Sequence, residues 1–475
     1  MDKEEFRKRG HELVDWMADF MQSKESYPVT PDVKPGEILS RLPEKAPDKA
    51  EPFEEIFSDF ENIIMPGMTH WQNPSFFGYF PANNSEPSIL AEMLMSTLGA
   101  QCMSWITSPA AAELEERVCD WLRDAKGIHS GWKGCIHDTA STATLSALLA
   151  AREKFSKFQI NKSGFTGTEK FRIYASTHVH SSIDKAVKIS GIGEENLVRV
   201  DVDEQFGMIP EALERAIQSD LNNGFSPLMV ISALGTTSST AVDPIGPITK
   251  ICKEYKVWHH IDAAFAGTAL LLPQFQSLME GHEDADSYVF NPHKWMMTNF
   301  DCTVMFLREP KHLVNTFSLT PEYLKTDLDE KVNNYRDWGI PLGRRFRALK
   351  LWFVIRSYGL DGLRTKIQYH LDLTKKAESW INEDERLEIL APVNFNTICF
   401  RYRDVELSTI ELNKINENWM SSSNSTHKVF FSHTKLDGKY VIRWVIGQTD
   451  VEEKHIQQAW VLLQDQLNKT LKTSA

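Results

Sequence analysis

Between about residues 110 and 310, short apolar runs alternate with stretches whose apolar residues recur at helical spacing. This alternation predicts right-handed βαβ units, and therefore a mostly parallel α/β sheet with helices on both faces. Ligands of such sheets bind at the carboxyl ends of the strands, so residues that directly follow a strand are the first candidates for chemistry. The candidate strands are Arg172–Ala175, Leu197–Val202, Leu228–Ala233, Val257–Ile261, Ser287–Phe290 and Thr303–Leu307, and the candidate helices are Leu145–Phe155, Ser181–Ile189, Ile209–Leu221 and Ile245–Tyr255.

The N-terminal segment, about residues 1–25, also repeats apolar residues at helical spacing. Pro28, Pro31 and Pro35 then interrupt the pattern. A helix without an immediate local partner must pack either on the main body of the protein or on another subunit.

The C-terminal third predicts a smaller α+β domain. Residues 310–345 are polar and typical of a loop, whereas residues 346–365 predict a long helix. Short strands at Ile398–Tyr402 and Val441–Val445 precede a final helix at Val451–Leu467. The expected divisions are an N-terminal helical segment (1–85), a large α/β domain (86–360) and a small α+β domain (361–475).

Composition narrows the function classes. The net charge of −13 argues against nucleic acid as a main partner, because a phosphate backbone attracts the opposite sign. The six cysteines are scattered without a Cys-x-x-Cys pair, which favours reduced thiols and a cytoplasmic protein. No signal peptide and no apolar run of about 18 residues is visible, so we expect no membrane span.

Lys294 is the sharpest candidate for chemistry, because it directly follows a predicted strand within the sequence Asn-Pro-His-Lys-Trp at 291–295. An ordinary surface lysine is the alternative. However, the neighbours Phe290 and Trp295 favour a desolvated amine. A neutral amine is what Schiff-base chemistry with a carbonyl cofactor requires.

Other candidates also follow strands or begin a helix. Asp262 precedes small residues and could keep a pyridinium nitrogen protonated, with a helix N-cap as the alternative. His180 could stack over a flat ring or move a proton, although a lone histidine is more often structural. The hydroxyl-rich run 138–144 and the sequence Gly-Thr-Thr at 235–237 could offer donors to a phosphate; an ordinary helix cap and a glycine turn are their alternatives.

Paired histidines raise a metal site as another possibility. His178 and His180 would project to one face of a strand, which suits half of a zinc site. His259 and His260 are adjacent and would face opposite sides. No His-Glu-x-x-His motif or cysteine cluster supports a metal, so we expect none.

Taken in chain order, these features and several further motifs are similar to one family. The chain resembles the pyridoxal-phosphate-dependent group II amino acid decarboxylases along nearly its whole length, and most closely the aromatic-L-amino-acid decarboxylases. The resemblance implies a fold type I α/β enzyme with pyridoxal 5'-phosphate as cofactor. It also implies a homodimer in which the N-terminal helices interlock and each active site is completed across the interface. The further motifs are Thr69-His70-Trp71, Phe76-Phe77-Gly78-Tyr79-Phe80-Pro81, Ser104-Trp105, Ala147–Arg152 and Ile340-Pro341-Leu342-Gly343-Arg344-Arg345.

The resemblance also implies roles for individual residues. Lys294 would bind the cofactor covalently, Asp262 would pair with its ring nitrogen, and His180 would stack above the ring. Tyr323 would deliver a proton to the substrate Cα. The implied cofactor contacts are Thr139, Ala140, Ser141, His180, Thr237, Asp262, Ala264, Asn291, His293 and Lys294. The implied substrate pocket is Trp71, Tyr79, Phe80, Pro81, Gln101, Met103 and Gly343, and the partner subunit would contribute Gln101 and Met103 to it.

The implied reaction is decarboxylation of an aromatic L-amino acid, such as DOPA, 5-hydroxytryptophan or tryptophan, to the arylalkylamine and carbon dioxide. Aldehyde synthases of the family carry phenylalanine in place of the loop tyrosine, so Tyr323 favours amine formation. An aromatic acetaldehyde synthase and a non-catalytic protein of the same fold are the alternatives. Gly343 stands where some relatives carry serine and leaves room for a large ring, whereas Gln101 could bind a ring substituent or face solvent.

Overall fold

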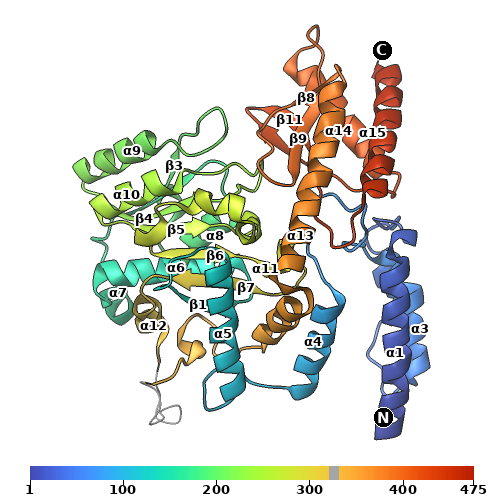
Figure 1. Ribbon diagram of the computed structural model, residues 1–475, viewed down its shortest axis with the longest axis horizontal. Helices are drawn as coiled ribbons and strands as arrows, with labels where there is room; N and C mark the ends of the chain where they lie inside the picture. The colour runs from blue at the N-terminus through green and yellow to red at the C-terminus, as the bar shows by residue number, and fades with distance from the viewer. Residues whose placement is uncertain (320–330, 475) are drawn as a thin grey trace. The chain divides into compact units, whose positions relative to one another are not determined.

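A seven-stranded sheet of order β1-β7-β6-β5-β4-β2-β3 is the central feature of the computed structural model, which describes residues 1–319 and 331–474 (Figure 1). Strands β2 to β6 run parallel, and β7 pairs antiparallel with both β6 and β1. The mostly parallel sheet is therefore confirmed, and the six candidate strands are all present. The strands are β1 (Lys133–His137), β2 (Phe171–Ser176), β3 (Leu197–Val200), β4 (Ser226–Ala233), β5 (Trp258–Asp262), β6 (Ser287–Phe290) and β7 (Thr303–Leu307).

Helices cover both faces of this sheet (Figure 1). On one face, α6 (Ala140–Ser156), α8 (Ser182–Ile189) and α12 (Lys311–Phe317) share an apolar core with the strands. On the other face, α9 (Pro210–Asn222) and α10 (Ile245–Tyr255) form a second core. All four candidate helices of this region are confirmed within a few residues of their expected ends.

Two expectations for residues 310–365 need correction. The stretch 310–345 is not loop throughout, because α12 occupies its first residues. The expected helix at 346–365 is longer: α13 extends over Arg347–Glu383, and Gly359, at φ +65°, breaks it into two helical segments. Four further α-helices lie between residues 86 and 295: α4 (Glu86–Leu98), α5 (Pro109–Ala125), α7 (Gln159–Ser163) and α11 (Pro292–Trp295).

Contacts divide the chain into two compact units. The sheet unit comprises residues 82–382 and 389–400, and the terminal unit comprises residues 1–81, 383–388 and 401–475. The expected boundaries at residues 85 and 360 stay a prediction. In the part of the chain that the structure describes, no helix is long and apolar enough to cross a membrane.

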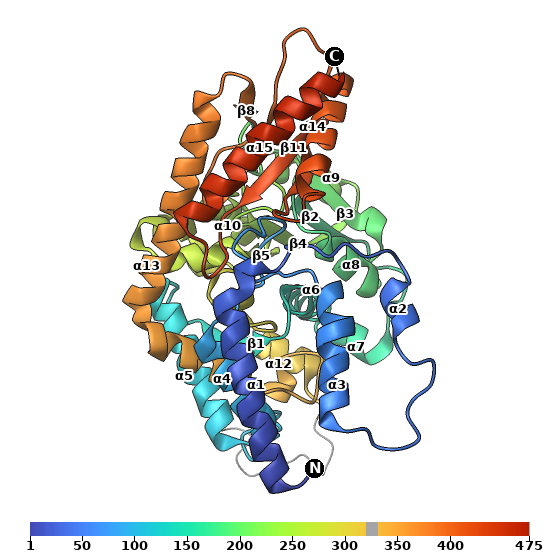
Figure 2. The ribbon, with the colours of Figure 1, turned by 90° about the vertical axis from the view of Figure 1, so that its right-hand side faces the viewer.

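The terminal unit pairs the N-terminal helix α1 (Lys3–Ser23) with α3 (Phe53–Asp59) (Figure 2). Asp2 caps α1 by accepting the Glu5 N–H at 2.9 Å. The Trp16 ring contacts Phe57 and Phe60, with centroids 6.1 and 5.3 Å away. The expectation that α1 lacks a local partner is therefore wrong, because the proline-rich segment after it returns a short amphipathic helix to its side.

The C-terminal elements form the expected smaller α+β part. A second sheet has the strand order β10-β11-β9-β8, with β10 and β11 joined as an antiparallel hairpin. The predicted strands at Ile398–Tyr402 and Val441–Val445 and the final helix are all present. The C-terminal elements are β8 (Leu387–Ile389), β9 (Thr397–Tyr402), α14 (Thr409–Asn424), β10 (Ser432–Leu436), β11 (Lys439–Val445) and α15 (Glu453–Ser474), whereas the short helix α2 (Glu37–Arg41) lies near the N-terminus.

Candidate active site

Lys294 lies on α11, a short helix that begins directly after β6. All residues from 291 to 298 are buried except Lys294, which keeps partial solvent access. Its neighbour Trp295 stacks on Phe265 at 5.2 Å and donates to His370 Nδ1 at 2.8 Å, which fixes the helix on the core. The expectation of a lysine held among buried apolar neighbours is confirmed.

Asp262 ends β5, where it is in register with Ala233 of β4 and Val289 of β6. Its Oδ1 accepts the Ala264 N–H at 3.0 Å, so the carboxylate closes a local turn. The next helical turn begins only at Ala266, and the helix N-cap alternative is therefore wrong. Asp262 and Ala264 both keep partial solvent access among buried neighbours.

His180 follows β2 and accepts the Ser182 N–H at its Nδ1, 3.0 Å away. Although the residue is solvent-exposed, partial burial of the imidazole lowers its pKa. The positive charge of Lys294 lowers this pKa further, whereas the negative charge of Asp262 opposes the shift. Strands β2, β5 and β6 run parallel, so His180, Asp262 and Lys294, which follow or end them, lie at the same carboxyl edge of the sheet.

The N-terminus of α6 opens at the same edge. Thr139 is its N-cap and accepts the Thr142 N–H at 3.4 Å, while Asp138 accepts the Thr139 N–H at 2.7 Å. The amides of Ala140 and Ser141 lie in the first turn, where no intrahelical acceptor exists. Ser141 is exposed, whereas residues 143–148 are buried. Free amides and the helix dipole make this end suitable for a phosphate.

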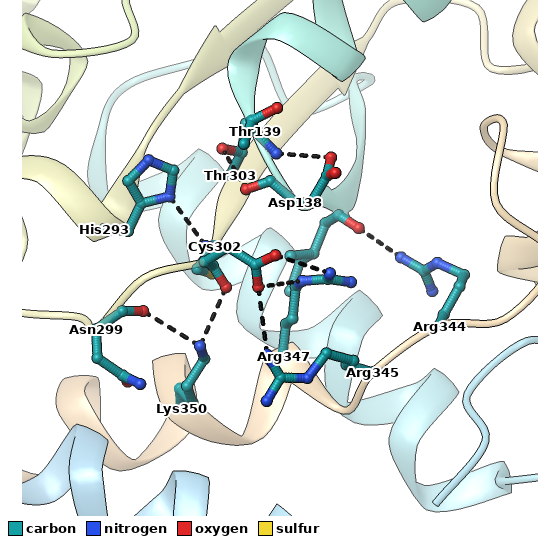
Figure 3. Close-up of polar contacts among 12 residues, drawn as sticks. Asp138, Thr139, His293, Asn299, Cys302, Thr303, Arg344, Arg345, Arg347 and Lys350 are labelled. Carbon is teal, nitrogen blue, oxygen red and sulfur yellow. Dashed lines mark hydrogen bonds and ion pairs between the residues drawn. The ribbon is translucent and has the colours of Figure 1, made fainter. Parts of the chain in front are cut away.

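Thr303, which the sequence analysis did not single out, joins the loop after β1, at Asp138, to the loop after β6, at Asn291. Its hydroxyl donates to Asn291 Oδ1 at 2.8 Å. The same hydroxyl lies 3.2 Å from the Asp138 carbonyl oxygen (Figure 3). The neighbouring His293 accepts the Cys302 N–H at 2.9 Å, and burial lowers its pKa to about 3. Strand pairing could have indicated Thr303, because it begins β7 between β6 and β1.

Thr237 lies in the turn after β4 and is partly accessible. The turn requires glycine at 235, where φ is +89° and an added Cβ would meet the Ala266 Cβ at 2.6 Å. Thr236 supports it by accepting the Ala241 N–H at 3.0 Å. The contact between Thr237 and a cofactor ring stays a prediction.

Three of the expected substrate residues, Gln101, Met103 and Gly343, belong to the sheet unit. Gln101 Oε1 accepts the Arg344 N–H at 2.7 Å, and a Cβ at position 343 would lie 3.1 Å from Gln101 Nε2. Both residues line a cavity of about 330 Å³. The Met103 carbonyl accepts the Arg336 N–H at 2.8 Å. Gln101 is solvent-exposed, as one of the two alternatives expected, and its amide oxygen also binds the backbone of its own chain.

The other four, Trp71, Tyr79, Phe80 and Pro81, belong to the terminal unit. The Trp71 and Tyr79 rings stack at 5.6 Å and are 36% and 52% exposed, so they form an accessible aromatic face. Tyr79 has a left-handed backbone, φ +53°, and its N–H donates to Ser432 Oγ at 3.0 Å. The Arg443 guanidinium lies 5.2 Å over the Phe80 ring.

The paired histidines have structural partners. His259 is hydrogen-bonded to Ser232 at 2.7 Å and Thr249 at 3.0 Å. His260 is hydrogen-bonded to Thr144 at 3.1 Å and to Ser287 at 2.8 Å, on the opposite face as expected.

Among residues 1–319 and 331–474, no group of three or more His, Cys, Asp or Glu side chains could hold a metal ion. Tyr323, the expected proton donor, lies outside the described residues.

Curated proteins and solved structures were compared along the whole chain. The chain is 41% identical to tyrosine decarboxylase 2 of Narcissus pseudonarcissus over 476 residues, which cover 98% of this chain and 94% of that protein. It is also 41% identical to phenylacetaldehyde synthase of Petunia hybrida over 477 residues, which cover 97% and 94%. The crystal structure of Catharanthus roseus tryptophan decarboxylase in complex with L-tryptophan matches with a TM-score of 0.93 and 36% identity, covering 99% of both chains.

A second solved structure, Oryza sativa TDC with PLP and tryptamine, matches with a TM-score of 0.95 and 33% identity, again over 99% of both chains. The family model described as the pyridoxal-dependent decarboxylase conserved domain matches residues 35–403. The accessible lysine at the strand edge and these likenesses agree, and the chain belongs to the pyridoxal-dependent decarboxylase family.

Proposed function

We propose that this protein is a pyridoxal-phosphate-dependent carboxy-lyase that converts an aromatic L-amino acid to its arylalkylamine and carbon dioxide. The observation that carries the proposal is the partly accessible Lys294, which shares one sheet edge with Asp262 and His180. Relatives named tyrosine decarboxylase and tryptophan decarboxylase support an aromatic substrate.

The donor set at this edge fits pyridoxal phosphate. Thr139, Ala140 and Ser141 at the start of α6 would hold the phosphate, and Asn291 and His293 support the adjacent loop. Bound there, the cofactor supplies a carbonyl that condenses with amines and a ring that takes up the electron pair released with the carboxylate.

The chain's own groups would then divide the work. Lys294 supplies the amine that holds the cofactor, and Asp262 supplies a carboxylate that keeps a facing ring nitrogen protonated. Partial burial lowers the pKa of His180, which favours its neutral form, and its imidazole would cover the ring. Tyr323 is proposed to return the proton to the substrate Cα, and Thr237 and Ala264 to contact the ring.

A product assay tests the reaction directly. Purified protein with added pyridoxal phosphate is given each aromatic amino acid in turn, and carbon dioxide, amine, aldehyde and peroxide are measured together. We expect amine and carbon dioxide in equal amounts with little peroxide. No product from any aromatic amino acid would contradict the proposal and favour the non-catalytic alternative.

Aldehyde synthesis is a second candidate, because phenylacetaldehyde synthases are as similar to the chain as the decarboxylases are. The two activities are separated by the variant Tyr323→Phe. We expect it to divert product from amine to aldehyde with matching peroxide, because the proposed proton donor is gone. Unchanged amine output would remove Tyr323 from this role.

We also propose that the protein acts as a homodimer. On α4, the side chains of Leu90, Met93, Leu94 and Leu98 are 39 to 64% exposed at helical spacing, which is an apolar stripe that a monomer would leave in water. Light scattering coupled to gel filtration should give twice the mass of the chain. Leu94→Glu should lower that mass toward one chain if the stripe lies in the interface.

A cytoplasmic location is proposed on the state of the thiols. All six cysteines are free and buried, as suits a reducing compartment. Fractionation of cells that express the tagged protein should recover it with cytoplasmic markers, and recovery with organelles would contradict this.

A further inference from the structure

Arg344 and Glu115 form a buried ion pair that joins two segments 229 positions apart in the chain. Both guanidinium ends take part: Nη1 donates to Glu115 Oε2 at 3.0 Å and Nη2 donates to Oε1 at 2.6 Å. The Arg344 side chain is 7% exposed and that of Glu115 is 4% exposed. A bidentate ion pair of this kind fixes the relative orientation of the two side chains as well as the distance between them.

The same pair holds the end of β1. Glu115 Oε1 accepts the Ile136 N–H at 2.8 Å, and Arg344 Nη2 donates to the Ile136 carbonyl at 2.6 Å. The backbone N–H and the backbone carbonyl of Ile136 are thus both bound by one ion pair. Asp138 and Thr139, which begin the proposed phosphate site, follow Ile136 in the chain after the single intervening residue His137.

On its other side, Arg344 holds the expected substrate residues. Its own N–H binds Gln101, and Gly343 precedes it in the chain. The guanidinium also lies 4.9 Å over the Tyr335 ring. The nearby Arg347 differs, because it binds Asp301 instead, at 2.9 and 3.1 Å.

We propose that Arg344 and Glu115 are a positioning pair that holds the phosphate end of the site in place relative to the Gln101–Gly343 segment of the same chain. This inference rests on the proposed function, since it assumes that the cofactor phosphate binds at the start of α6. Apolar residues of similar volume usually stabilise a core as well as a buried ion pair does. Stability alone therefore does not explain why a buried ion pair stands at this position. The need to fix the geometry of the site does explain it.

Three variants separate positioning from stability: Glu115→Gln, Arg344→Lys and the double variant R344M/E115L. For each, we would measure the melting temperature, the dissociation constant of pyridoxal phosphate by absorption titration, and kcat and KM for L-tyrosine and L-tryptophan. Both single variants should weaken cofactor binding and lower kcat/KM on the order of 10-fold to 100-fold, as small misplacements do. The double variant should regain the melting temperature of the unaltered protein but keep the weak cofactor binding.

Glu153 provides a matched control in the same unit. It is fully buried, binds Arg152 at 2.9 Å and accepts the Asn161 N–H at 2.9 Å, but it lies near the far end of α6. Glu153→Gln should lower the melting temperature without the fall in cofactor affinity.

Two outcomes would overturn the proposal. One is full recovery of cofactor affinity in the double variant, and the other is an equal loss of affinity in Glu153→Gln. The cofactor titration needs no turnover, so these outcomes remain distinct from a failure to decarboxylate aromatic amino acids.

Discussion

The carboxyl edge of the sheet unit and the aromatic face of the terminal unit are built in opposite ways. At the sheet edge, Lys294 and Asp262 are partly accessible side chains in buried surroundings, each on a segment held by neighbouring strands. On the aromatic face, Trp71 and Tyr79 are substantially exposed and contact each other.

The two regions differ in accessibility because the sheet edge is expected to carry out charge and proton transfer, whereas the aromatic face is expected to recognise a flat ring. Charge and proton transfer depend on preorganised groups, so a displaced donor or carboxylate costs rate. Recognition of a flat apolar ring depends on shape and apolar area, where a single methylene changes selectivity only modestly. We therefore expect changes at the sheet edge to affect kcat strongly, and changes in the expected substrate residues to alter substrate ratios.

Replacing Lys294 should have the largest effect. Lys294→Ala should lower turnover by roughly four orders of magnitude or more, because the amine that holds the cofactor is lost. The visible absorption of the bound cofactor should vanish as well. Lys126 is the matched control: it is fully buried in the same unit, donates to the Gly267 carbonyl and lies 3.8 Å over the Phe290 ring. Lys126→Met should keep the absorption band, and normal turnover in Lys294→Ala would refute the assignment.

Asp262→Asn should rank second. The amide cannot hold a proton on a ring nitrogen as a carboxylate does, so kcat should fall on the order of 100-fold to 1000-fold. Cofactor absorption should persist, because Lys294 is intact. A full rate would mean that another group protonates the ring.

The histidines of the sheet unit predict a loss of stability in acid. Burial lowers the pKa of His137, His259 and His293 to about 3 and that of His260 to about 4, from an ordinary value of 6.5. Below pH 6.5 the unfolded chain takes up protons that the folded chain excludes, so the free energy of unfolding falls as the pH drops toward 4. At pH 5 each such histidine should cost about 2 kcal/mol.

Urea unfolding at pH 7 and pH 5 measures this loss, and hydrogen exchange locates it. The sheet unit should lose more protection than the terminal unit. His259→Gln should reduce the difference between the two pH values by about 2 kcal/mol, whatever its effect at pH 7. Equal stability at both pH values would contradict the burial argument.

The residues of the sheet edge were largely predictable from sequence, because they directly follow apolar runs. Such runs can be recognised locally, without knowing which distant segments they pack against. β1 was missed, since Lys133–His137 is short and contains Gly134, which must approach Cys119 and Phe306 closely. The bridging role of Thr303 depends on antiparallel pairing that periodicity does not reveal.

Longer-range features were not predictable at all. Arg344 and Glu115 meet only after the fold forms, because 229 positions separate them. Likewise, α3 follows a proline-rich stretch whose local pattern gives no sign that it returns to α1. The terminal unit combines both ends of the chain, which local sequence patterns do not bring together. Its aromatic residues were therefore named by resemblance to a family and not by a sequence pattern.

Gly343→Ser should have the smallest effect and is the sharpest test of the substrate side. A Cβ at this position would lie 3.1 Å from Gln101 Nε2 and 3.8 Å from Oε1, so the amide must shift by a few tenths of an ångström. That shift narrows the space for a large ring, and the kcat/KM ratio of L-tryptophan to L-tyrosine should fall about 10-fold. Combining it with Gln101→Ala, which removes the opposing amide, should restore part of the ratio. If kcat fell equally for both substrates instead, Gly343 would belong with the catalytic edge, and the contrast between catalytic and substrate residues would fail at this position.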